Sequence, residues 1–147
     1  MKRAQKISMR LAAAAMCLLI SLAPSVAFGP SLSVITATIA NGDSVSGSIA
    51  LGDDPVVAIR MPAAWTAAVV TFQVSDDGTT FGDLYNLAGD ETTVQIPAGG
   101  ALAGKVVALS PWEFAGARYI KIRSGTGASP VSQGAARTLT LITRINQ

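Results

Sequence analysis

The sequence predicts an all-β fold: a single antiparallel β-sandwich of the jelly-roll type, with about eight or nine short strands. Short runs rich in β-branched residues recur at intervals of about ten residues, separated by Gly, Pro, Asp and Asn. No segment keeps a 3.6-residue apolar period over three turns. The 147 residues suit one core rather than two, and a chain that is 50% hydrophobic and 14% charged is not expected to be disordered.

Five strands are predicted in the first half of the domain, at 31–40, 45–51, 57–61, 69–75 and 79–85. The first ends at Asn41-Gly42-Asp43, a turn signal. In the third, alternation places Val57, Ile59 and Met61 inward and Arg60 outward. Asp76-Asp77-Gly78 predicts a tight turn between the fourth and fifth strands, because glycine supplies the positive φ that such a turn needs.

Four more strands are predicted at 92–96, 105–109, 118–123 and 138–145. Between them, Pro111-Trp112-Glu113-Phe114 predicts one helical turn with Ser110 as its cap. Segments 99–100 and 124–136 are typical of irregular loops, and the second is long enough to suggest a functional or interface role. The side chains expected to lead the core are Val70, Phe72, Val74, Ile120, Ile122, Leu139 and Leu141.

Residues 1–27 have the three parts of a secretory signal peptide, and residues 28–147 are then the sandwich domain. Four basic residues precede an apolar run from Leu11 to Ile20, and Ser25-Val26-Ala27 offers a cleavage site. Cleavage would leave seven basic and nine acidic side chains, a net charge of −2. Two alternatives stay open: an uncleaved membrane anchor, for which about 20 apolar residues would be needed, and a start site at Met9 or later.

The composition argues against an enzyme. Histidine is absent, which removes the commonest general base and zinc ligand, and Cys17 is the single cysteine. Neither a Gly-x-Ser-x-Gly nor a Ser-x-x-Lys motif occurs, so no activated serine is predicted. Gly125-Thr126-Gly127 lacks the residues that complete a phosphate loop. We expect no catalytic residue, no cofactor and no metal site.

The charged residues are expected to lie at the surface, in turns or on solvated strand faces. The pairs Asp53-Asp54, Asp76-Asp77 and Asp90-Glu91 lack the spacing of a calcium loop and are typical of turns. Arg118, Lys121 and Arg123 are predicted to form the solvated face of a strand. A slightly acidic mature chain disfavours nucleic acid as a partner, and only residues 1–27, if uncleaved, would contact a membrane.

Three aromatic side chains are the candidate ligand or interface residues: Trp65, Tyr85 and Trp112. Exposed Trp and Tyr can stack on sugar rings or anchor a protein interface. A lone Trp in a small sandwich more often covers the end of the core. That structural interpretation is favoured for Trp112, whereas the two interpretations of Trp65 are about equally weighted.

Two stretches carry a resemblance to known proteins: 71–81, which contains Ser75-Asp76-Asp77-Gly78, and 117–123, which reads Ala-Arg-Tyr-Ile-Lys-Ile-Arg. The pair resembles discoidin-like jelly rolls of the galactose-binding fold. Together with 61–68, 114–119 and 123–126, it also looks like small β-sandwich proteins of tailed bacteriophages and prophages. The first likeness implies a jelly roll, and the second implies a virion component. The chain lacks the bracketing cysteines and long loops of discoidin domains, so no binding residues are carried over.

The functional expectation is a non-catalytic structural or interaction protein, a phage-like virion or surface-assembly component that binds protein partners or itself. The alternative is a secreted glycan-binding module of discoidin-like type. The leader would place the protein in the periplasm, on the cell surface or outside the cell, and a phage-encoded protein would lie in the virion.

Overall fold

The computed structural model describes residues 31–96 and 102–144. The predictions for residues 1–27, for the loop at 99–100 and for the strand end at Ile145 lie outside these ranges. Within them, no helix has the length and apolar character needed to span a membrane.

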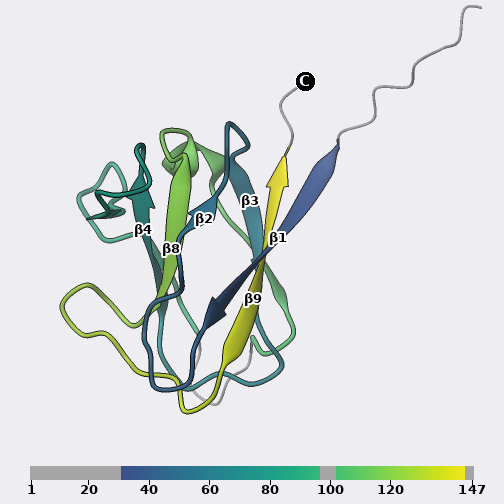
Figure 1. Ribbon diagram of the computed structural model, residues 1–147, viewed down its shortest axis with the longest axis vertical. Helices are drawn as coiled ribbons and strands as arrows, with labels where there is room; N and C mark the ends of the chain where they lie inside the picture. Colours follow the sequence, from purple (N-terminus) through teal and green to yellow (C-terminus); the bar gives the residue numbers. More distant parts are fainter. Residues whose placement is uncertain (1–30, 97–101, 145–147) are drawn as a thin grey trace, which may run out of the picture.

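Two antiparallel sheets pack face to face, as Figure 1 shows, and the predicted β-sandwich is therefore confirmed. One sheet has four strands in the order β1-β9-β3-β7, and the other has the order β2-β8-β4-β5 with β6 also paired to β4. The strands are β1 (Leu32–Ile39), β2 (Ile49–Ala50), β3 (Val56–Arg60), β4 (Val70–Ser75), β5 (Gly82–Asp83), β6 (Thr93–Val94), β7 (Val106–Ala108), β8 (Tyr119–Ser124) and β9 (Arg137–Arg144).

The core fills the space between the sheets. Of the seven side chains expected to lead it, Val74 is half-buried and the other six are fully buried. The predicted helical turn forms as the 3₁₀ helix η1 (Pro111–Phe114), although the Ser110 side chain makes no capping hydrogen bond. Phe114 from η1 meets Phe72 edge to face, with ring centroids 5.1 Å apart. This contact anchors η1 to the end of the core.

Three predicted strands, at 45–51, 79–85 and 92–96, have only two residues each in the structure. In the first two, side-chain hydrogen bonds replace part of the ladder. In the segment predicted as 45–51, the Ser46 hydroxyl accepts the Ile122 N–H at 3.0 Å, and only β2 remains regular. In the segment predicted as 79–85, one carboxylate oxygen of Asp77 accepts the N–H groups of Thr79 and Thr80 and curls the chain before β5.

The predicted inward set of β3 is wrong at Val57. The register against β9 shifts between Val56 and Ala58, so that Val56 takes the buried position and Val57 is half-buried. A β-bulge of this kind adds one residue to a strand and reverses the alternation before it. Ile59 and Met61 are buried and Arg60 is exposed, as predicted.

Candidate functional site

The two stretches that carry the discoidin-like resemblance meet in neighbouring strands, where Ser75 of β4 lies opposite Tyr119 of β8. The Ser75 hydroxyl donates to Asp77 at 2.9 Å and accepts the Gly78 N–H at 2.9 Å, which closes the predicted turn. Gly78 has a φ of +76°, and a Cβ there would lie 3.0 Å from the Tyr119 ring. This motif pair therefore has a structural role in closing the end of the sheet.

The outer face of the five-stranded sheet is polar and yet largely covered. We call it the covered face and define it by the cross-strand pairs Thr71–Arg123, Gln73–Lys121 and Ser75–Tyr119. The Thr71 hydroxyl donates to the carbonyl of Gly125 at 2.8 Å, and the Lys121 ammonium lies 4.0 Å from the centre of the Phe81 ring. Loops from both sides of the sheet therefore fold over this face, on the left of Figure 1.

An ion-pair network holds these loops and corrects the prediction for Arg123. Its side chain is not solvated: only 6% of the residue is exposed, and the guanidinium pairs with Asp83 and, at 3.1 Å, with Glu91. Glu91 also accepts the Gly127 N–H at 2.9 Å. Arg123 donates a hydrogen bond to Asp83, and this bond lowers the pKa of Asp83 more than burial raises it.

The backbone at Gly127 lies close against this network, a position that its sequence did not suggest. A Cβ at this position would lie 2.3 Å from a carboxylate oxygen of Asp83 and 3.0 Å from the Arg123 guanidinium. The Gly125-Thr126-Gly127 segment therefore lets the backbone approach an ion pair. The prediction that Asp90-Glu91 only forms a turn is wrong for Glu91, because its carboxylate binds Arg123 and the loop amide.

The outer face of the four-stranded sheet is different, and we call it the bare face. Opposite residues share a face in an antiparallel sheet, so the registers place Val34, Ile142, Ala58 and Ala108 in one row. The next row is Thr36, Thr140, Arg60 and Val106, and the end rows are Leu32 with Arg144 and Thr38 with Thr138. None of these side chains is buried, and Val34 is 65% exposed.

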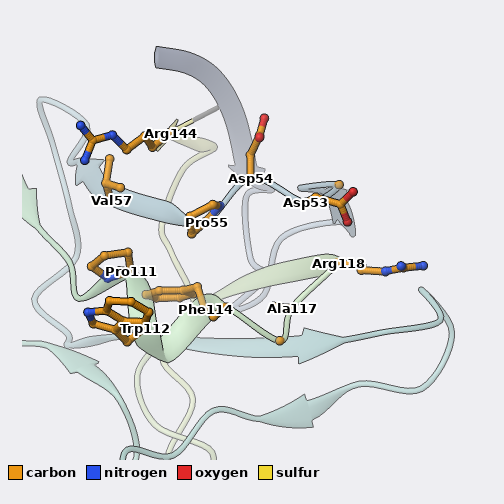
Figure 2. Close-up of a pocket in the computed structure, with 13 residues that line it drawn as sticks. Asp53, Asp54, Pro55, Val57, Pro111, Trp112, Phe114, Ala117, Arg118 and Arg144 are labelled. Carbon is orange, nitrogen blue, oxygen red and sulfur yellow. The ribbon is translucent and has the colours of Figure 1, made fainter. Parts of the chain in front are cut away.

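A hollow of about 620 Å³ lies at the end of the sandwich where η1 and the β2–β3 turn meet. Figure 2 shows Pro111 and Trp112 on one side of it and Pro55, Asp54 and Arg144 on the other, with Asp53 and Arg118 together at one end. A smaller hollow of about 300 Å³ shares Asp53 and Arg118 with it. The lining therefore offers an aromatic surface, carboxylate acceptors and guanidinium donors.

The three candidate aromatic residues are not brought together. Trp65 is 9% exposed, and its indole N–H donates to the carbonyl of Ala68 at 3.0 Å, so it belongs to the core. Trp112 is 86% exposed at the rim of the hollow. Tyr85 is exposed beside a turn that the Asn86 side chain orders through the N–H groups of Ala88 and Asp90, and it lines neither hollow.

No protein-family model and no curated protein matches this chain. Among solved structures, the chain is similar to the C-terminal domain of a chitobiase from Bacteroides fragilis, at 17% identity and a TM-score of 0.31. The match covers 80% of this chain and 68% of that one. A likeness at this score carries no argument about fold or function.

Proposed function

We propose that this chain is a non-catalytic structural or interaction protein that assembles into a larger particle, such as a virion or a cell-surface structure. The observation that carries the proposal is the bare face. A row of Val, Ile and Ala side chains crosses the whole four-stranded sheet, and the two rows beside it consist of Leu, Val, Thr and Arg side chains. An exposed row of apolar side chains with arginine beside it is typical of a protein interface.

The charges on the bare face support the same proposal. The described rows of the bare face contain two charged side chains, the guanidinium groups of Arg60 and Arg144, and no carboxylate. Charged residues are depleted at the centre of interfaces, whereas arginine is enriched in them. The resemblance of 61–68, 114–119 and 123–126 to phage proteins favours a virion as the particle.

The test is to measure the mass and the location of the protein as its source produces it. Size-exclusion chromatography with light scattering should show an oligomer or a complex, and the protein should be present in purified particles or surface fractions. A monomer that is absent from both would contradict the proposal.

A second candidate function, glycan binding, is favoured by Trp112. Its indole is almost fully exposed beside a hollow that also presents Asp54 and Arg118. An aromatic face can stack on a sugar ring while charged groups hydrogen-bond to hydroxyls. The shared lining of the two hollows would suit more than one sugar unit.

A glycan array probed with the natural protein, with Trp112→Ala and with Tyr85→Ala tests this second function. Tyr85 is the matched control, because it is an exposed aromatic residue outside both hollows. Binding should be lost with Trp112→Ala alone. The absence of any saccharide signal, or a signal that Trp112→Ala leaves unchanged, would contradict glycan binding at this site.

A further inference from the structure

The strand β1 leaves a long free edge on the four-stranded sheet. All eight of its residues pair with β9 on one side, and β1 is the end strand of the sheet order. No strand of the described residues pairs with its other side. At about 3.4 Å per residue, this edge is about 27 Å long.

The other end strands of the described sheets have much shorter free edges. The strands β7, β2 and β5 have three, two and two residues. Short end strands are a common protection against unwanted pairing, as are charges, prolines and bulges. The sequence of β1, Leu-Ser-Val-Ile-Thr-Ala-Thr-Ile, contains no charge and no proline, and its register with β9 is continuous.

We infer that β1 pairs with β1 of a second copy of this chain, antiparallel and about a two-fold axis, to form a closed dimer with one eight-stranded sheet. This inference rests on the proposed assembly function and names its first partner. A second β1 is the occupant because, among the described end strands, no other one matches the length of this edge. Pairing of a strand with its own copy uses the edge in both chains and therefore closes.

The alternation of side chains limits the register of this pairing. Residues directly opposite in an antiparallel pair point to the same face, so outward residues must lie opposite outward residues. The two fullest overlaps then place Leu32 opposite Thr38 of the second copy, or Thr36 opposite its own copy. In both, the bare faces of the two chains join into one continuous surface.

The test compares two substitutions that add the same charge to the same row. Thr36→Lys changes the free edge, and Thr140→Lys changes the residue beside it on β9, an inner strand of the sheet. Because Thr36 lies near the two-fold axis in both registers, Thr36→Lys brings two like charges together. We expect it to weaken dimerisation about tenfold or more, whereas Thr140→Lys should leave the dimer intact.

The measurement is light scattering over a concentration series, with the protein as its source processes it. Hydrogen exchange should show β1 amides protected in the natural dimer and released by Thr36→Lys, and circular dichroism confirms that the variants fold. A natural dimer that Thr36→Lys does not weaken, or that Thr140→Lys weakens equally, would overturn pairing through β1 and leave the proposed assembly function in place. A monomeric protein would also overturn pairing through β1, and a monomer that is absent from both particles and surface fractions would overturn the proposed assembly function as well.

Discussion

The two outer faces of this sandwich reverse the usual relation between polarity and exposure. The covered face is polar, but Thr71, Ser75 and Arg123 on it are buried. The bare face carries Leu32, Val34 and Val106, all at least half exposed. Polar groups are normally outside and large apolar groups inside, so both faces require an explanation.

Ion pairs and hydrogen bonds explain why polar groups are buried on the covered face. The Arg123 guanidinium pairs with the carboxylates of both Asp83 and Glu91, and the Gln73 amide donates to Asp83 at 3.1 Å. Buried charges are tolerated only when they are paired in this way. The loops around β5 and after β8 are therefore linked to this face by ion pairs and hydrogen bonds.

The bare face has no such internal explanation among the described residues. The one hydrogen bond between side chains of its described residues joins the hydroxyls of Thr38 and Thr138 at 2.9 Å. The fold gains little from its exposed valines, because their area stays in water. The covered face therefore satisfies its polar groups by contacts within the chain, whereas the bare face leaves apolar side chains exposed.

The largest expected effect on stability is at Arg123. Arg123→Ala leaves the carboxylates of Asp83 and Glu91 without their cation and should lower the free energy of unfolding by about 3 kcal/mol. The matched control is Arg60→Ala on the bare face, which should change it by less than about 0.5 kcal/mol. Urea denaturation measures both free energies of unfolding. Equal losses would mean that the buried Arg123 contributes no more to stability than the exposed Arg60.

The next effect tests the packing of the loop against the ion pair. Gly127→Ala places a Cβ 2.3 Å from the Asp83 carboxylate and should cost about 1–3 kcal/mol. Gly134→Ala is the control in the same loop, because its Cβ would have no heavy atom within 4 Å. The thermal midpoint should fall for Gly127→Ala only. Equal changes in the thermal midpoint of the two variants would mean that Gly127 does not pack against the ion pair.

The sequence predicted most of the fold because its signals are local. The β-branched run at 31–40, the alternation within 118–123 and the turn at Asp76-Asp77-Gly78 each depend on neighbouring residues, and each has its counterpart in the structure. The bulge at Val56 and the shortened β2 could not be predicted. They depend on hydrogen bonds to β9 and to Ile122, which are distant in the sequence.

The charged network could not be predicted for the same reason. Asp83, Glu91 and Arg123 lie in three separate segments, and the alternation around Arg123 alone is typical of a solvated strand. Trp65 and Trp112 both follow a short Pro-containing segment, so the local sequence does not distinguish them. Their placement depends on tertiary packing. Exposure of Trp112 and burial of Trp65 became visible only in the fold.

Acidification should weaken the ion pair on the covered face and lower the stability of the fold. The pKa of Asp83 lies below its ordinary value, so its ion pair stabilises the fold above about pH 4 and is lost as the pH falls through the folded pKa. The urea midpoint should therefore drop on acidification, and Asp83→Asn should reduce that dependence. Part of the acid dependence should remain, because the N–H groups of Thr80 and Thr79 also lower the pKa of Asp77. Arg60→Gln, on the bare face, should keep the full acid response.

The smallest expected effect on stability is at Val34 on the bare face. Val34→Thr keeps the β-branched shape and changes an exposed side chain, so the free energy of unfolding should change by less than about 0.5 kcal/mol. The matched control is Val70→Thr, which puts the same hydroxyl into the core and should cost about 1–3 kcal/mol. Urea denaturation at a concentration low enough to keep both variants monomeric separates folding from assembly. A large loss for Val34→Thr under those conditions would mean that the row from Val34 to Ala108 is covered within the chain, and the bare face would then belong to the core rather than to an interface.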